Sequence, residues 1–587
     1  MAIGRAPRLA PVALFCFLVE ANHGHVLHVN CSGLPFEMAL QAAVAQGLLN
    51  RHRGAHVWLS DLAEGLGAAG QKDGAGYPGT KFIEWKTGHA GGPWYQPAST
   101  CRTCQGLRDR WRQTAREASG QTFVPTSFEN LMDAVRPLMS GRVLYAAAEM
   151  HALGPVLTMA GVEAAMPVTM QHDSFQALPM LLDTRGMWKD ATAATVYTTS
   201  TLLRKTNKSA FVVQAPTCLP YLADVVVDYK LAMFWMPDMC SKATESTKAQ
   251  HSAMEEFIEA SGHFNMTTNL YYMGWYNRTR QPNPELLEEC TSLHKLITLA
   301  SDQSDNLSFL NKLRALFSDS QPLSQVPMWQ GGQSCKYAAS KAYIAIIISD
   351  GDNIAQDWST LRPLLEERVR SGSKIPVSWT ISNRWMQWGP AVLSWAYSQA
   401  HKTGVDSFLM GPSGYGYLFP GNMTRSEDKD AFALATITAA RSLEMRGYVH
   451  WDVDLFLDNA TTARTIDFLK RFVGSAISGA FMLGSDPLTG KWPDDQPYAS
   501  PVFVKSVAAF KPIYQYGPPN ATAAAAAINA VPPGSMVYVY LSLGDDMSIV
   551  DQIAELKSTN IELVGYRELI ELARQKQSRE RSWTLLV

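Results

Sequence analysis

The sequence of 587 residues lacks several features that would assign it directly to a functional class. Its charges almost cancel, with 51 Lys and Arg residues against 53 Asp and Glu residues, which argues against a nucleic-acid partner or a polybasic contact with a membrane. No segment supplies about 18 uninterrupted apolar residues, so we expect no membrane span. Walker phosphate loops, G-x-S-x-G nucleophile elbows and His-Glu-x-x-His motifs are also missing, and no cofactor is predicted.

Cysteine is scarce and provides no zinc pattern. Eight Cys residues are present, and only Cys101 and Cys104 form a close pair, without a second pair at matching spacing. In a secreted chain a local disulfide between these two residues is favoured over a redox motif. Cys16 falls in the N-terminal apolar stretch, so an odd number of seven remains and at least one thiol is left over.

The N-terminus has the pattern of a secretory signal peptide over residues 1–21. Arg5 and Arg8 precede an apolar stretch from Leu9 to Val19, and small residues place the cut after Ala21. A buried N-terminal helix is the alternative. We therefore expect a secreted or secretory-lumen protein. Eight N-x-S/T triplets support this as glycosylation acceptors, at Asn30, Asn207, Asn265, Asn277, Asn306, Asn422, Asn459 and Asn520, provided that each is exposed.

The apolar patterns predict an α/β protein with several units. We expect an N-terminal α/β region at residues 22–224, possibly two subdomains, a third small α/β subdomain at 225–317, a linker at 318–334, a larger domain at 335–575 and a polar tail at 576–587. In the larger domain eight strand-like runs alternate mostly with helices: Tyr343–Ile348, Val377–Ile381, Ser407–Met410, Tyr448–Trp451, Gly479–Leu483, Val502–Val504, Met536–Leu541 and Ile561–Val564. This rhythm favours a (β/α)8 barrel of the TIM type, with an open doubly wound sheet as the alternative.

Carboxylates follow several of these strands. In a barrel, the loops after the strands build the active face. Asp350 and Asp352 end the first strand, Asp454 follows the fourth and Asp545 follows the seventh. Two carboxyl groups, one acting as acid and one as base or nucleophile, are what glycoside hydrolysis needs. The same cluster could instead hold a hard cation such as calcium, and each acidic turn taken alone could be a solvated turn.

Aromatic residues on glycine-rich loops add a possible sugar-binding surface. The predicted substrate-binding set follows the first three strands and comprises Asn353, Trp385, Trp388, Tyr415, Tyr417 and Phe419. The glycines at 411, 414, 416 and 421 leave little adjacent bulk to cover the rings, so we expect them to be exposed for stacking on sugars. The competing interpretation is aromatic packing beneath loops.

The run Gly414-Tyr-Gly-Tyr-Leu-Phe-Pro420 fits the pattern G-x-G-Y-x-Y-P, with Phe419 in place of the final Tyr. The chain thereby resembles the family of GxGYxYP putative glycoside hydrolases. The elbow Ser349–Asn353 is similar to the start of that family's C-terminal domain, and Leu48–Arg51 and Ala300–Ser308 resemble its N-terminal patterns. The resemblance covers roughly residues 28–575 and implies small N-terminal subdomains before a barrel-like catalytic domain.

The sequence therefore predicts a secreted carbohydrate-active hydrolase that takes an oligosaccharide, polysaccharide or glycoconjugate as substrate. Two alternatives stay open. A non-catalytic glycan-binding or cell-surface interaction protein would keep the aromatic surface without a hydrolytic carboxyl pair. A metal-dependent, deacetylase-like hydrolase would use the acidic strand ends to hold a cation.

Overall fold

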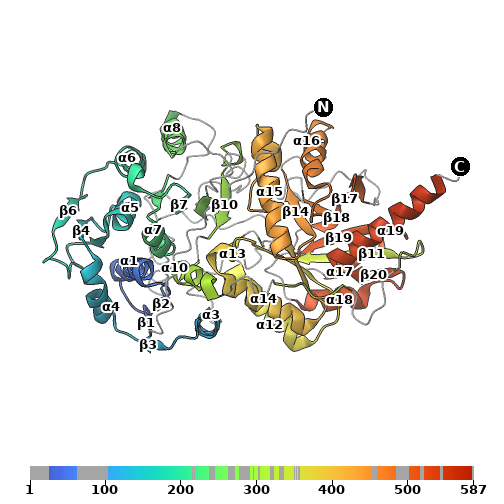
Figure 1. The fold of residues 1–587 in the computed structure, drawn as a ribbon, viewed down its shortest axis with the longest axis horizontal. Coiled ribbons are helices and arrows are strands. Elements are labelled where there is room, and N and C mark those ends of the chain that lie inside the picture. The colour runs from blue at the N-terminus through green and yellow to red at the C-terminus, as the bar shows by residue number, and fades with distance from the viewer. Residues whose placement is uncertain are drawn as a thin grey trace, which may run out of the picture.

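The computed structural model describes the chain from residue 25 to residue 584 with gaps. The described residues are 25–62, 104–214, 216, 219–236, 245–261, 271–275, 291–294, 296–301, 304–316, 323–328, 336–348, 351, 353–354, 357–452, 459–483, 501–515, 521–541 and 547–584. Their strands form four sheets, with the N-terminal units at one end of the elongated molecule and the largest sheet at the other (Figure 1). No helix in this described part is long and apolar enough to cross a membrane.

The first three sheets are small and parallel. The first has the order β2 (Val57–Ser60), β1 (Val26–Asn30), β3 (Phe123–Pro125). The second has the order β5 (Ala165–Val168), β4 (Gly141–Leu144), β6 (Met180–Asp183). The third has the order β10 (Ile297–Ala300), β9 (Tyr271–Trp275), β7 (Ala210–Gln214), β8 (Ala232–Phe234). The sequence predicts that the third small subdomain starts at residue 225. Strand β7 belongs to its sheet, so this subdomain begins upstream of that residue.

Helices pack around these sheets. They are α1 (Phe36–Arg53), α3 (Cys104–Ser119), α4 (Phe128–Val135), α5 (Leu153–Glu163), α6 (Ala191–Tyr197), α7 (Ala223–Tyr229) and α8 (Glu245–Ala260). Helix α1 is buried from Ala39 to Asn50, because its small residues admit close neighbours. A Cβ on Gly47 would lie 2.5 Å from the carbonyl oxygen of Asp224, so α1 and α7 can touch at this point only through glycine.

Polar side chains of α1 pair with two residues that are distant in the sequence, Asn306 and Ser308. The Nδ2 of Asn50 donates to the Oγ of Ser308 at 3.0 Å, and the Nε2 of Gln46 donates to the Oδ1 of Asn306 at 2.7 Å. Ser308 lies in the short helix α10 (Leu307–Leu310), which is followed by the 3-10 helix η7 (Asn311–Leu316). Buried polar side chains are stable only when they are paired. The need for these pairs explains why Asn and Ser stand at buried positions where α1 meets α10.

The largest sheet has ten strands, and all of its neighbouring pairs are parallel except β16–β17. Its strands are β11 (Ala342–Ile348), β12 (Ser378–Ile381), β13 (Ser407–Met410), β14 (Gly447–Trp451), β15 (Gly479–Leu483), β16 (Val502–Val504), β17 (Val507–Phe510), β18 (Pro512–Gln515), β19 (Met536–Leu541) and β20 (Ile561–Val564). The accompanying helices are the π-helix η8 (Asp357–Leu361), α12 (Arg362–Ser371), α13 (Trp385–Trp388), α14 (Pro390–Thr403), α15 (Ser426–Ser442), α16 (Asn459–Leu469), α17 (Ala521–Asn529), α18 (Ser548–Leu556) and α19 (Tyr566–Thr584).

This sheet is a curled half-barrel. Its strand order differs from that of a regular eight-stranded barrel. The path runs β16-β17-β15-β14-β13-β12-β11-β19-β18. Three strands pair with β11. Strand β19 pairs with its residues Tyr343–Ile348, β20 with Ala342–Ala345 and β12 with Ile347–Ile348. Since β19 occupies one edge of β11, β20 and β12 share the other. In a regular barrel β20 would lie between β19 and β11, so the barrel prediction is confirmed only as a curled, mostly parallel α/β sheet.

Alternation along the strands divides the core into two faces. Tyr343, Ile347, Trp451 and Tyr538 belong to the cluster on one face, and Ile344 and Tyr448 belong to the larger cluster on the face that carries the helices. The first face is covered by the start of α19 and by Tyr417 and Phe419, which belong to the same cluster. The period of two along each strand is the reason for this division.

The N-terminal units are joined to the large sheet through α3. The indole rings of Trp111 and Trp358 stack with centroids 4.7 Å apart, and the Nε1 of Trp111 donates to the carbonyl oxygen of Trp358 at 2.7 Å. The Arg362 guanidinium lies 4.5 Å from the Trp111 ring and 4.6 Å from the Trp395 ring. This buried aromatic contact fixes the N-terminal units against α12 and α14.

Candidate functional site at the carboxyl edge of the large sheet

The acidic elbow after β11 is anchored to the carboxyl end of β12. Gly351 donates its backbone N–H to the Oγ1 of Thr380 at 2.9 Å, and that hydroxyl donates to the carbonyl oxygen of Ile348 at 2.6 Å. A Cβ on Gly351 would lie 2.0 Å from the carbonyl carbon of Thr380. The glycine at the centre of the elbow is therefore required for close approach of two backbones.

The end of β12 presents polar side chains that sequence reasoning missed. The Nδ2 of Asn383 donates to the carbonyl oxygen of Gly414 at 2.6 Å, and the Oδ1 of Asn383 is buried and accepts no hydrogen bond from the described residues. Asp357 lies beneath this turn, and its Oδ2 accepts from the N–H of Ser382 at 3.1 Å and from the Nε1 of Trp385 at 2.9 Å. The Asp357 carboxylate thus fixes the turn that carries Asn383.

Arg384 contributes a buried positive charge to the same edge. Its guanidinium lies 4.3 Å from the centroid of the Tyr415 ring, and its Nη2 donates to the Oε1 of Gln387 at 2.5 Å. Arg384 is only 3% exposed, so its charge acts in a region of low dielectric. A cation placed there favours the ionised form of any carboxylate nearby.

The aromatic side chains predicted to stack on sugars are mostly buried, which corrects that prediction. Trp385, Trp388, Tyr417 and Phe419 are each less than 5% exposed, and only Tyr415 is partly exposed. The signature loop packs against the third sheet. Tyr417 forms an isolated antiparallel bridge with Thr298 of β10, and Phe419 donates its N–H to the Oγ of Ser292 at 2.8 Å. The competing interpretation of aromatic packing beneath loops therefore holds for these four rings.

The glycines of the signature loop have the opposite role to the one we predicted. A Cβ on Gly416 would lie 2.2 Å from the Cγ2 of Ile297, and Gly414 has a φ of +109°, which side chains rarely adopt. Glycine here admits a neighbouring strand instead of leaving the rings uncovered. Phe419 stands where the family pattern has Tyr, and its ring is fully buried beside Tyr417 at a centroid distance of 6.0 Å.

Asp452 ties the end of β14 to the end of the signature loop. Its Oδ2 accepts from the N–H of Gly421 at 2.8 Å and lies 3.9 Å from the Nε2 of His450. The Nδ1 of His450 is 3.0 Å from the Oη of Tyr448, and both side chains are buried on the helix-covered face. Burial lowers the pKa of His450 to about 3, so its imidazole is neutral at ordinary pH. Asp452 lies on this same face by its register.

All four predicted catalytic carboxylates, Asp350, Asp352, Asp454 and Asp545, lie outside the described residues. Of the predicted substrate-binding set, the structure brings Asn353, Trp385, Trp388, Tyr415, Tyr417 and Phe419 to the carboxyl edges of β11, β12 and β13. In the part of the chain that the structure describes, no three His, Cys, Asp or Glu side chains gather as a metal site would.

The predicted glycosylation acceptors differ in accessibility. Asn30 and Asn207 are exposed and Asn422 is partly exposed, while Asn265, Asn277 and Asn520, and the side chain of Asn459, lie outside the described part. Asn306 is 1% exposed, and its amide exchanges hydrogen bonds of 2.8 Å with the backbone N–H and carbonyl of Leu59. Because a glycan cannot fit into this packing, the prediction of a modified Asn306 is wrong.

The predicted Cys101–Cys104 disulfide also lies outside the described side chains. Cys31 is described as a free, buried thiol, and burial raises its pKa to about 12. A thiol held protonated in this way is unreactive.

Comparison with known proteins adds a family and a fold. A solved structure described as a putative hydrolase from Bacteroides thetaiotaomicron VPI-5482 has a TM-score of 0.70 at 15% sequence identity, with 94% of each chain covered. At that identity the likeness shows a shared fold alone. No curated protein matches the chain. Residues 340–574, which contain both the acidic elbow and the signature loop, match the GxGYxYP putative glycoside hydrolase C-terminal domain, and this confirms the resemblance to that family.

Proposed function

We propose that this chain is a hydrolase that cleaves glycosidic bonds at the carboxyl edge of the curled sheet. The observation that carries the proposal is the anchoring of the elbow at Gly351 against β12, within the region that matches the family's C-terminal domain. Carboxyl ends of parallel strands are where α/β enzymes bind their substrates. The anchor holds Gly351, which stands between Asp350 and Asp352 in the sequence, and this supports the choice of the two carboxylates.

Asp350 and Asp352 are the first candidates for the acid and the base or nucleophile, with Asp454 and Asp545 next. Glycoside hydrolysis needs one protonated and one ionised carboxyl group. The buried guanidinium of Arg384 lies at the same edge and would stabilise the ionised partner. The partly exposed ring of Tyr415 at this edge would contact a sugar face.

We also propose that the protein is secreted and carries glycans. The signal-like N-terminus and the exposed acceptors Asn30 and Asn207 support this. Expression in a eukaryotic secretory host, followed by enzymatic removal of N-glycans, tests it. A smaller apparent mass after treatment is expected, and an unchanged mass contradicts the proposal.

The activity is tested by a hydrolysis screen of the full chain on aryl glycosides and polysaccharides, with and without a chelator. Cleavage that resists the chelator is the expected result. Cleavage that disappears with chelator and returns with a divalent cation would support the metal-dependent alternative. Saturable glycan binding without cleavage across the panel would support the non-catalytic alternative, for which the buried rings offer less surface than the sequence suggested.

A further inference from the structure

The π-helix η8, which leads into α12, needs a hydrogen-bond donor that its own helix does not supply. In a π-helix the carbonyl of each residue accepts the N–H of the residue five positions further on. For Trp358 that position is Pro363, which has no N–H. A buried carbonyl without a donor is costly, so the donor must come from elsewhere in the fold.

Helix α3, which belongs to the N-terminal units, supplies this donor. The Nε1 of Trp111 donates to the carbonyl oxygen of Trp358 at 2.7 Å, and the two indole rings stack with an interplanar angle of 6°. Both side chains are buried, at 1% and 5% exposure. A side chain that inserts into the hydrogen-bond ladder of a helix alters its local winding, so Trp111 holds η8 in its π-helical form.

The π-helix in turn carries the carboxylate that supports the candidate site. Asp357 is the first residue of η8 and is fully buried. Its Oδ2 accepts from the N–H of Ser382 and from the Nε1 of Trp385. The Trp385 ring also lies 6.1 Å from the Trp358 ring, centroid to centroid. A shift of η8 therefore moves the turn at the carboxyl end of β12.

This turn reaches the signature loop through two side chains. The Nδ2 of Asn383 donates to the carbonyl oxygen of Gly414 at 2.6 Å, and the guanidinium of Arg384 lies 4.3 Å from the centroid of the Tyr415 ring. An unbroken series of contacts thus runs from Trp111 in α3 to the partly exposed ring of Tyr415.

We propose that Trp111 is a positioning residue of the candidate site. It lies outside residues 340–574, which match the family's C-terminal domain, so the N-terminal units complete a site that this domain builds. The indole N–H fixes η8, η8 fixes the turn after β12, and the turn places the ring of Tyr415 for the substrate. The effect on the substrate rests on the proposed function, whereas the effect on the turn does not.

Trp111→Phe in the full chain tests the proposal, because it removes the N–H and keeps an aromatic ring beside Trp358. Hydrogen–deuterium exchange in peptides that cover residues 382–388 is expected to become about threefold to tenfold faster. The KM for the best substrate of the hydrolysis screen is expected to rise about threefold to tenfold. A smaller folded fraction would lower kcat and leave KM unchanged, so KM separates positioning from a general loss of stability.

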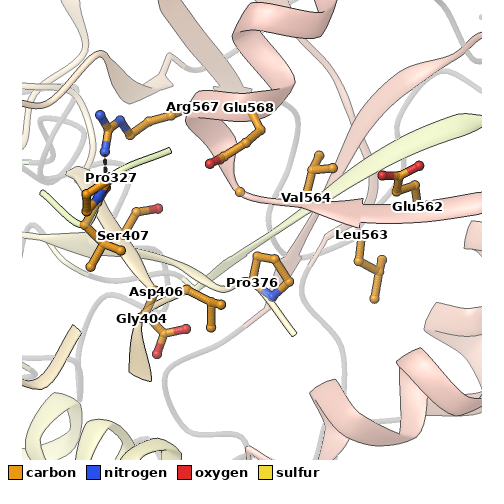
Figure 2. Close-up of a pocket in the computed structure, with 13 residues that line it drawn as sticks. Pro327, Pro376, Gly404, Asp406, Ser407, Glu562, Leu563, Val564, Arg567 and Glu568 are labelled. Atoms are coloured by element: carbon orange, nitrogen blue, oxygen red, sulfur yellow. Dashed lines mark hydrogen bonds between the residues drawn. The ribbon is translucent and has the colours of Figure 1, made fainter. Parts of the chain in front are cut away.

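Thr114→Val is the matched control. The Thr114 hydroxyl accepts from the Nη1 of Arg362 at 3.0 Å, so the substitution also removes a hydrogen bond between α3 and α12 but leaves the bond to Trp358 in place. Exchange at 382–388 and the KM should both stay unchanged. Strand β20 is an internal reference in every variant, because it borders a cavity of about 230 Å³ at the amino ends of β12 and β13, away from these contacts (Figure 2).

Asp357→Asn tests the next contact of the series. It replaces a charged acceptor by a neutral one, so the same turn should exchange faster and KM should rise. In the double variant with Trp111→Phe, KM should rise by less than the product of the two single effects, because both act on one turn. Effects that multiply would contradict the series of contacts.

Unchanged exchange at 382–388 in Trp111→Phe overturns the proposal, and so does equal acceleration in Thr114→Val. Faster exchange with an unaltered KM also overturns it, because the turn then does not serve the substrate. If the unmodified chain cleaves no substrate, the proposed function fails, and exchange alone decides whether Trp111 positions the turn.

Discussion

Substitution of Gly351 by alanine tests the anchor on which the candidate site depends. The added Cβ would lie 2.0, 2.2 and 2.3 Å from the Thr380 carbonyl carbon, the Thr380 carbonyl oxygen and the Ile381 nitrogen. These are backbone atoms of a buried strand, and ordinary contact begins at 3.4 Å, so the elbow must move by more than 1 Å. Overpacking of this kind costs about 1–3 kcal/mol, and loss of the bond from the Gly351 N–H to Thr380 adds about 0.5–1.5 kcal/mol.

We therefore expect Gly351→Ala to lower the free energy of unfolding by about 2–4 kcal/mol, measured by urea denaturation. Gly372→Ala is the control. Gly372 has a φ of +66° but no heavy atom within 4 Å of its Cβ position, so only the backbone strain of about 1 kcal/mol applies. Hydrolysis should fall about a hundredfold in Gly351→Ala, because a 1 Å displacement misplaces the flanking carboxylates. Unchanged stability and activity would refute the anchor.

Three further outcomes are expected. Because burial lowers the pKa of His450 to about 3 in the folded chain, its contribution to stability is fully present above pH 6.5 and is lost as the pH falls toward 3. His450→Gln should therefore reduce the slope of the unfolding free energy against pH by up to about 1.4 kcal/mol per pH unit. An unaltered slope would contradict this. Asn306→Ala should lower the free energy of unfolding, measured by urea denaturation, by about 2–5 kcal/mol because it leaves the backbone groups of Leu59 unpaired. Asn207→Ala, at an exposed glycosylation acceptor, should lower it by less than about 0.5 kcal/mol. Equal effects would contradict the buried network. A double-mutant cycle between Trp111→Ala and Arg362→Ala should give a coupling energy of about 1–2 kcal/mol, and additive effects would show that the stacked cation is not stabilising.

The strands of the large sheet are predictable because each is a short run of apolar and aromatic residues bounded by polar or turn residues. Tyr343–Ile348, Ser407–Met410 and Gly479–Leu483 were placed within one residue of β11, β13 and β15. Strands β17 and β18 were missed. They are short, Ala508 and Ala509 have little strand preference, and Lys511 interrupts the run.

The position of β20 was not predictable from its own residues. Which edge of β11 it joins depends on pairing over 200 residues of chain, and the local pattern of Ile561–Val564 is the same for either edge. The sequence rhythm therefore indicates βα units without specifying how they close.

The burial of the signature loop was also beyond the sequence. Glycines beside aromatic rings predicted exposure, but Gly416 lies against Ile297, which is more than a hundred residues away in the chain. Glycine is equally suited to an open loop and to close packing, and only the partner distinguishes the two. Asn306 presents the same difficulty, because a three-residue acceptor pattern contains no information about burial.

The most direct test of the proposed hydrolase is the kcat/KM of Asp350→Asn and Asp352→Asn on the best substrate from the screen. Asp133→Asn, at a carboxylate whose side chain is 74% exposed, is the matched control. The account predicts a loss of about a hundredfold or more in at least one elbow variant, unaltered folding in both, and no loss in the control. Equal cleavage by all four proteins would contradict the assignment of the reaction to the elbow.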